Sequence, residues 1–317
     1  MRGSLALASV ALLACKEAPP RPTCPDAPTQ AVSAAATPPS ATAATPTPAA
    51  PRDDDAQLQF RAGGKVVRAL RKHELRTTLP NETVRVDDNY YDGKPKTWRA
   101  IPLARLVEHG FEGSGHALAE QSYILRCIDG YTVPFDGKRL LEAGGYLAFA
   151  DADVAEWEPV GTKRDNPGPY FVVWGEPEQQ NLEEYPRPYQ LAAIEIASFE
   201  STFPHVLPTG EKEGSPADRG FVLFKAQCIR CHAVNQEGGR VGPELNVPRN
   251  VLEYRSEAQV KAFIRAPRSF RYSAMPSHPH LTAADLDALV AYLRAMGKRK
   301  HDPLAKAGKG TTSPSKP

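Results

Sequence analysis

The sequence contains little sulfur and few long apolar runs. Of its 317 residues, 5 are cysteine and 3 are methionine. Cys15, Cys24 and Cys127 each stand alone, so the chain offers no second Cys pair or Cys/His pair to complete a four-ligand zinc site. Apart from a short apolar stretch at the start, no segment approaches the length of a transmembrane helix. The sequence therefore predicts neither a four-ligand zinc module nor a membrane-spanning helix in the body of the chain.

One short stretch gathers the remaining cysteines. In "FKAQCIRCHAV", residues 224–234, Cys228 and Cys231 are separated by two residues and His232 follows directly. Thiolate and imidazole are good zinc ligands, but the same spacing is the attachment signature of a c-type haem. With haem, the two thiols become thioethers to the porphyrin and His232 becomes the proximal iron ligand, so the motif is complete in itself. We expect one covalent haem c, with a zinc site as the weaker alternative.

The N-terminus indicates where the protein resides. "MRGSLALASVALLACKEAPP" has a positive start at Arg2 and an apolar run from Leu5 to Leu13, which suits a signal peptide and is too short to span a bilayer. It ends in "LLAC", which resembles the lipobox of bacterial lipoproteins, with Cys15 as the residue that would be lipidated. An ordinary cleaved signal peptide is the alternative. We expect an extracytoplasmic protein on the periplasmic side, held to a bacterial membrane by its lipid anchor.

Composition and charge divide the chain into five parts. The predicted parts are a lipoprotein signal peptide at 1–15, a disordered Ala/Pro/Thr tether at 16–52, domains at 53–208 and 211–300, and a disordered tail at 301–317. Residues 53–210 carry 17 Lys and Arg against 25 Asp and Glu, whereas residues 211–300 carry 15 against 9. The opposite net charges of these two segments favour two separate domains. No nucleic-acid partner is expected.

Three helices are predicted in the second domain. Ser215 and Pro216 are suited to begin a helix that runs into the CxxCH motif, and Thr282 with Asp285 predicts a capping box for the last helix. A shorter helix between them, "SEAQVKAFIRAP", should stop at Pro267.

Residues 211–300 resemble a class I cytochrome c. The motifs "CIRCH", "GGRVGPEL", "YSAMP" and "LDALVAYLRAM" occur in the order of that family. The resemblance implies an all-α domain in which the first helix, through Gly220 and Phe224, crosses the last helix at Leu289 and Tyr292. It also implies that the carbonyl of Pro243 accepts a hydrogen bond from His232, which would orient the imidazole ring.

The sixth iron ligand has to be found outside the CxxCH motif. Met275 is followed by Pro276, as the ligand methionine is in that family, whereas Met296 lies on the apolar side of the last helix and is expected in the core. His278 and His280 are rival ligands, and an open site is a further alternative. Two filled axial positions leave no place for a substrate, so we expect an electron carrier and not an enzyme, with redox proteins as partners.

The domain at 53–208 is predicted to be a β-rich α+β sandwich. The runs "WRAIPLARLVEHG", "CIDGYTVPF", "NPGPYFVVWGEP" and "YPRPYQLAAIEI" resemble the molybdopterin-binding domain of the sulfite oxidase family. That family binds molybdenum through a cysteine before the segment equivalent to Trp98, and "ETVRVDDNYYDGKPKTW" has none. Cys127 lies elsewhere, in a predicted hairpin, and is interpreted as a strand residue. The resemblance therefore implies the fold without molybdopterin.

Two functions remain open. The first is a membrane-anchored, periplasmic, monohaem c-type cytochrome that transfers electrons, with the sandwich serving for docking. The second is an oxidoreductase whose N-terminal domain binds a pterin or another small molecule and passes electrons to the haem. A haem peroxidase is a weaker alternative, because such enzymes usually need an open haem position.

Overall fold

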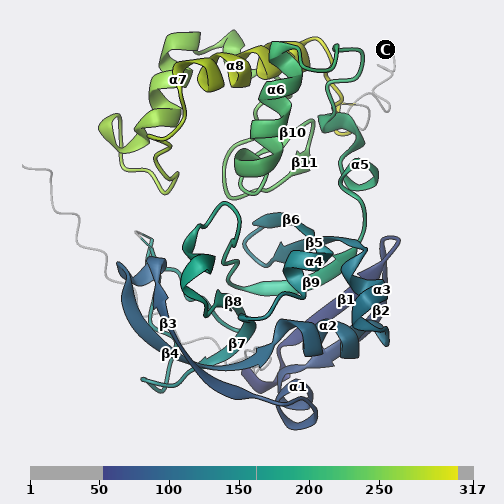
Figure 1. The fold of residues 1–317 in the computed structure, drawn as a ribbon. Coiled ribbons are helices and arrows are strands. Elements are labelled where there is room, and N and C mark those ends of the chain that lie inside the picture. The colour runs from purple at the N-terminus through teal and green to yellow at the C-terminus, as the bar shows by residue number, and fades with distance from the viewer. Residues whose placement is uncertain (1–52, 162, 306–317) are drawn as a thin grey trace, which may run out of the picture. The chain divides into compact units, whose positions relative to one another are not determined.

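The computed structural model describes residues 53–161 and 163–305 (Figure 1). The predicted signal peptide, Cys15, Cys24 and the tether lie outside the described residues, as does the tail after residue 305. The described part comprises a β-rich region, residues 53–198, and a helical region, residues 199–301. None of the described helices is long and apolar enough to cross a membrane.

Two sheets make up the β-rich region. The first has the strand order β2-β1-β9-β5-β6 and the second the order β3-β4-β7-β8; every described pairing is antiparallel except that of β1 with β9. The strands are β1 Gln57–Ala62, β2 Lys65–Arg71, β3 Glu82–Asp88, β4 Lys94–Pro102, β5 Ser122–Cys127, β6 Thr132–Asp136, β7 Gly145–Asp151, β8 Phe171–Trp174 and β9 Leu191–Ile196. Figure 1 shows β3 and β4 as a long curved hairpin. The β-rich character predicted from the sequence is confirmed.

One core joins the two sheets. Leu58 and Phe60 of β1 belong to the same buried cluster as Leu147 of β7 and Trp174 of β8. Alternate residues of a strand point to opposite faces, and accordingly Phe171 of β8 belongs to a second cluster, beyond the β3-β4-β7-β8 sheet. Short helices cover the edges of the sheets: α1 Lys72–Thr78, α2 Leu103–Phe111, α3 Gly115–Ala119 and α4 Gly137–Leu140.

The helical region has the three helices that the sequence predicts, preceded by a short one. The helices are α5 Phe199–Thr202, α6 Pro216–Leu223, α7 Glu257–Arg265 and α8 Ala283–Gly297, with a two-residue hairpin of β10 Ala233–Val234 and β11 Glu237–Gly238. Ser215 caps α6, because its side chain accepts a hydrogen bond from the amide of Asp218. Thr282 and Asp285 form the predicted capping box of α8. A π-helical turn, Phe224–Cys228, continues α6 into the CxxCH motif.

The boundary between the two regions differs from the predicted one. The sequence suggested that the first domain extends to residue 208, but Phe199, Phe203 and Val206 are buried in the core of the helical region. The hydroxyl of Tyr292 in α8 donates a hydrogen bond to the carbonyl of Val206 over 2.8 Å. These apolar side chains decide the boundary because they are buried against α6 and α8, whereas the Pro, Gly and charged residues after them only mark a turn.

The C-terminal boundary also moves. A disordered tail was expected from residue 301, yet the amide of His301 donates to Asn235 Oδ1 over 2.9 Å and its ring stacks on that of His205, with the centroids 3.6 Å apart. The helical region therefore includes His301.

Candidate functional site

The CxxCH motif forms a tight turn at the end of the π-helical segment. The amides of Cys231 and His232 both donate to the carbonyl of Cys228, over 3.1 and 2.9 Å. Both thiols are half-buried, and Cys127, Cys228 and Cys231, the cysteines within the described ranges, are all free of disulfide bonds. The two cysteines are thus held in one turn of the backbone, with neither thiol used in a disulfide.

His232 is oriented as an iron ligand requires. Its Nδ1 lies 2.9 Å from the carbonyl oxygen of Pro243, so Nδ1 carries the donated proton and Nε2 is left with a free lone pair. This is the hydrogen bond that the resemblance to cytochrome c implies. Burial lowers the pKa of His232, although the Pro243 carbonyl opposes that shift, and the neutral imidazole is the form that ligates a metal.

Gly242 allows the imidazole to lie where it does. A Cβ atom at this position would lie 2.5 Å from Cε1 of His232, closer than any non-bonded carbon pair tolerates. Gly242 belongs to the "GGRVGPEL" motif, which by itself indicates no role for this glycine. The requirement depends on a contact between two segments, which spacing along the chain does not reveal.

The environment of the two thiols favours their protonated form when no group is bound to them. Burial, reinforced by the neighbouring thiol, raises the pKa of Cys228 to about 12, and burial with the nearby Asp129 raises that of Cys231 to about 11. Within the described residues, the motif does not belong to any group of three or more side chains whose ligand atoms lie within 4.8 Å of one another. The described residues thus bring no cluster of zinc ligands together at the motif, which favours covalent haem over zinc.

The expected sixth ligand lies in the loop before α8. Met275 is half-buried, and its amide donates to Ser273 Oγ over 3.1 Å. Met296, by contrast, is 1% exposed within the core of the helical region, where it was expected. His278 is half-buried, and burial followed by the charges of His280 and His232 lowers its pKa. His278 lies three residues after Met275 in the same loop and so stays a rival ligand.

Three buried asparagines, Asn235, Asn246 and Asn250, support the segment between the CxxCH motif and α7; the sequence did not predict them. Asn246 Nδ2 donates to Asn235 Oδ1 and to the carbonyl of Met296, and Asn250 Nδ2 donates to the carbonyl of Leu293. The last carbonyls of a helix have no partner within it, so these amides satisfy the C-terminal end of α8. The segment that follows Pro243 is thereby tied to α8. No sequence signal distinguishes a buried asparagine from an exposed one.

The β-rich region contacts the CxxCH motif directly. The amide of Thr132 donates to the carbonyl of Arg230, and that of Arg240 donates to the carbonyl of Gly130, each over 3.0 Å. The Arg230 guanidinium donates to the carbonyls of Leu182 and Glu183 over 2.9 and 2.5 Å. The motif therefore lies against the β5–β6 turn and the loop at 181–184.

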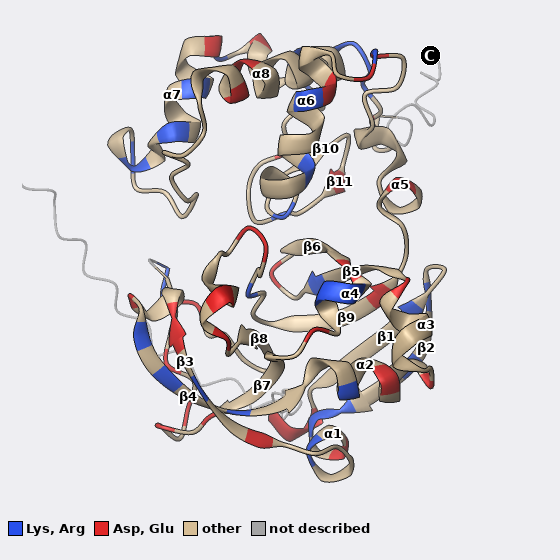
Figure 2. Ribbon diagram, viewed as in Figure 1, with Lys and Arg blue, Asp and Glu red and all other residues tan. Residues whose placement is uncertain are grey.

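Basic residues also lie away from this contact. Figure 2 shows Lys and Arg on α6, on α7 and in the loop that follows α7. Arg249, on the segment before α7, is well exposed; its guanidinium donates to the carbonyl of Glu253 over 3.1 Å and makes a long ion pair with the Glu253 carboxylate, 3.8 Å between Nε and Oε2. Part of the positive charge of the helical region thus remains on its surface.

Cys127 is the last residue of β5 and is 8% exposed within the core that joins the two sheets. Burial, with the charge of Asp129, raises its pKa well above the usual range for a thiol. It is a strand residue, as the sequence interpretation expected, but it is buried in the core and not half-buried as that interpretation had it.

The buried thiol of Cys127 gives a testable expectation. In the folded protein at pH 8, iodoacetamide should leave Cys127 unmodified, because only the thiolate reacts and both burial and the raised pKa suppress it. In denaturant the same residue should be alkylated fully, as measured by peptide mass spectrometry. Rapid alkylation of Cys127 in the folded state would instead indicate a reactive, accessible thiol.

Comparison with known proteins identifies the helical region. The family model described as cytochrome C oxidase, cbb3-type, subunit III matches residues 215–293. Cytochrome c oxidase subunit 2 of Alkalihalophilus pseudofirmus is 36% identical over 88 residues, which are 25% of this chain and 25% of that protein. The chain thus matches a quarter of the relative's length. Residues 215–293 form a cytochrome c domain, which implies covalently bound haem c and electron transfer.

Proposed function

We propose that the protein is a monohaem c-type cytochrome that transfers electrons between redox proteins on the outer side of a bacterial membrane. The observation that carries the proposal is the geometry of His232, whose Nδ1 is occupied by the Pro243 carbonyl while Nε2 is free, within a segment that matches a cytochrome c family model. A bound haem supplies one-electron exchange between ferric and ferrous iron.

Each side chain of the site has a defined part in this function. Cys228 and Cys231 form the two thioether links, and His232 binds the iron through Nε2. Met275 supplies the sixth ligand, and thioether ligation favours the ferrous form and raises the potential. If His232 and Met275 both bound the iron, they would leave no open position for a substrate, and the bound haem would serve for electron exchange.

The β-rich region serves as a docking partner of the haem domain in this proposal. Its 181–184 loop and β5–β6 turn make hydrogen bonds to the CxxCH segment. Trp98 lies in β4, and the strand before it, β3, contains no cysteine that could bind molybdenum as in the sulfite oxidase family. The competing function is an oxidoreductase with a pterin in the β-rich region. The contact between the two regions favours it, because electrons would have to pass from the pterin to the haem.

Membrane attachment is part of the same proposal. It depends on "LLAC" at the end of the apolar N-terminal run, with Cys15 as the lipidated residue. One acyl chain alone binds a membrane marginally, so a lipoprotein carries more than one. Mass spectrometry of the N-terminal peptide from the membrane fraction tests whether Cys15 carries lipid.

Cofactor analysis decides between the two functions. Purified protein, expressed with haem and molybdenum cofactor maturation intact, should contain one haem c per chain and no molybdenum. Haem is measured by its pyridine haemochrome spectrum and molybdenum by elemental analysis. The double variant Cys228→Ser/Cys231→Ser, prepared identically, is the control for covalent haem. Molybdenum in stoichiometric amount would establish the oxidoreductase instead.

A further inference from the structure

Three potential metal ligands gather where the loop after Met275 contacts the β-rich region. They are Glu183, His278 and His280, and one ligand atom from each lies within 4.8 Å of the other two. In the described part of the chain, this is the one group of three or more His, Cys, Asp or Glu side chains with such spacing. Two imidazoles and one carboxylate form a donor set that suits zinc and related divalent transition metals.

Glu183 is held in position from several sides. Its amide donates to Asn181 Oδ1 over 2.9 Å, and its own carbonyl accepts from the Arg230 guanidinium. Gln227 Nε2 donates to one carboxylate oxygen, Oε2, over 3.1 Å. The other oxygen, Oε1, faces His280 Nε2 at 2.8 Å. One oxygen is thus oriented by the protein while the other points toward the histidines, which is how supporting hydrogen bonds orient a ligating carboxylate.

The two histidines lie on a restrained segment. Their rings are 5.7 Å apart between centroids and inclined at 67°. The amide of His278 donates to the carbonyl of Ile264 at the end of α7, over 3.3 Å. Pro279 stands between the two histidines, and its ring fixes one backbone dihedral and restricts the residue before it. Little conformational entropy remains to be lost when both imidazoles bind one ion.

The distance between His280 and Glu183 is close to that of two ligands of one tetrahedral ion, and the His278 ligand atom lies within 4.8 Å of both. Bonds of about 2.0 to 2.1 Å place two ligand atoms about 3.3 Å apart at the tetrahedral angle. The 2.8 Å between Glu183 Oε1 and His280 Nε2 has to widen only slightly. His280 and Glu183 are exposed, so water reaches the site and can fill the position that three protein ligands leave open.

We propose that Glu183, His278 and His280 bind one divalent transition-metal ion of the zinc class. Such an ion would link the 181–184 loop of the β-rich region to the loop that carries Met275, and so hold the haem domain against its neighbour. This site is separate from the CxxCH motif, and binding of Zn²⁺ to it can be measured whether or not the haem assignment is correct. Without a metal, His280 Nε2 lies 2.8 Å from Glu183 Oε1 and 3.3 Å from Gln227 Oε1.

Titration with zinc tests the site in the full-length, haem-loaded protein after treatment with chelator. Isothermal calorimetry should show one Zn²⁺ bound per chain. His280→Ala and Glu183→Gln should each weaken binding about tenfold or more, since even the outer partners of metal ligands contribute about 10- to 100-fold to affinity.

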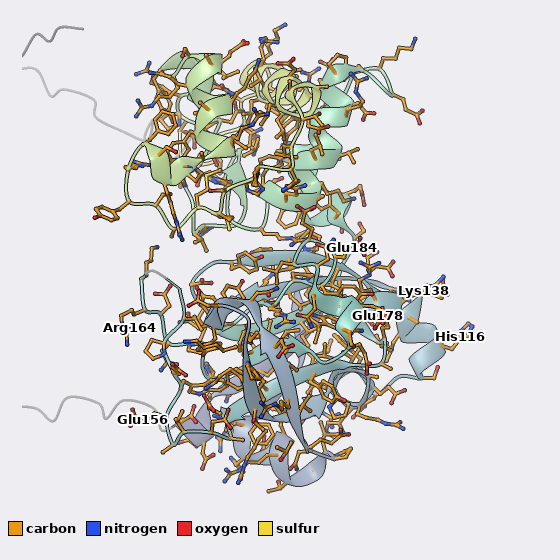
Figure 3. All side chains as sticks on the ribbon, turned by 60° about the vertical axis from the view of Figure 1, so that its left-hand side comes forward. His116, Lys138, Glu156, Arg164, Glu178 and Glu184 are labelled. Carbon is orange, nitrogen blue, oxygen red and sulfur yellow. The ribbon has the colours of Figure 1, made fainter. Side chains whose placement is uncertain are left out.

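Two matched variants control for binding elsewhere. Glu184→Gln changes the neighbouring carboxylate, which pairs with Arg139 at 3.3 Å, and His116→Ala removes an exposed histidine of α3. Figure 3 labels both side chains. Both variants should bind Zn²⁺ like the unaltered protein.

Three results would overturn the proposal. The first is no Zn²⁺ binding by the unaltered protein. The second is equal Zn²⁺ affinity in His280→Ala, Glu183→Gln and the two controls. Either result would mean that Glu183 and His280 contact each other without binding a metal ion. The third is a changed haem spectrum in His278→Ala with an unchanged spectrum in Met275→Ala, because His278 would then belong to the iron. An unchanged haem spectrum in His280→Ala, together with weakened Zn²⁺ binding, supports the separate site.

Discussion

Replacing Met275 with alanine should lower the haem midpoint potential by something on the order of 0.1 V, because the identity of the axial ligand is a main determinant of that potential. The iron should lose its six-coordinate, thioether-ligated spectrum and gain an open or water-bound axial position. Absorption spectra of both oxidation states and a redox titration measure these changes. Met275 is half-buried in the loop before α8, within the segment that also holds both rival histidines.

Met296 provides the matched control. It belongs to α8 and is 1% exposed within the core of the helical region, so Met296→Leu, which nearly conserves volume, should leave the spectrum and potential unchanged and cost less than about 1.5 kcal/mol of stability. If Met275→Ala is silent and His278→Ala or His280→Ala alters both spectrum and potential, the sixth ligand is a histidine. If Met296→Leu alone alters them, the core methionine is the ligand.

Replacing Gly220 with alanine should destabilise the cytochrome c domain by about 3 kcal/mol, the upper end of the usual cost of overpacking. A Cβ atom at position 220 would lie 1.9 Å from the carbonyl oxygen of Ala288 and 2.8 Å from Cβ of Tyr292. The first contact is with backbone of α8, which cannot rotate away, so the two helices would have to separate. Phe224 and Tyr292, whose ring centroids are 5.0 Å apart, would lose their packing as well.

The sign of this effect is informative, because helix propensity alone predicts the opposite. In an unpacked helix, alanine is more favourable than glycine by about 0.8 to 1 kcal/mol. Val222→Ala on the same helix is the control; Val222 is 59% exposed and should change stability by less than about 0.5 kcal/mol. Denaturant unfolding followed by haem absorbance measures both. Stability equal to or above that of the unaltered protein in Gly220→Ala would show that α6 and α8 do not depend on close approach.

Features formed by a few residues close together in the chain were predicted correctly from the sequence. The Ser215 cap and the Thr282–Asp285 capping box are satisfied within a single helical turn, so their spacing alone predicts them. The hairpin of β1 and β2 turns at two glycines, both at positive φ, and that pair was recognisable in the sequence. The hydrogen bond from His232 to Pro243 was implied by resemblance to a family.

Other features depended on contacts between distant segments. Phe199 and Val206 were assigned to the end of the first domain, yet they are buried with α8. An apolar side chain in the sequence predicts burial, but it does not show which element the side chain packs against. The parallel pairing of β1 with β9 was equally hidden, since strand periodicity determines which face a side chain occupies and not which strand lies beside it.

Residues close together in the chain specify the CxxCH turn, the helix caps and the β1–β2 hairpin, and the scarcity of methionine leads to Met275 as the expected sixth ligand. That Glu183 lies beside His280, and Gly242 against His232, follows from the folded structure alone. The two kinds of feature differ in the range of the contacts that form them. A cap or a turn is closed by bonds between neighbours, whereas a metal-binding cluster or a close approach arises only when packing of the core brings separate segments together.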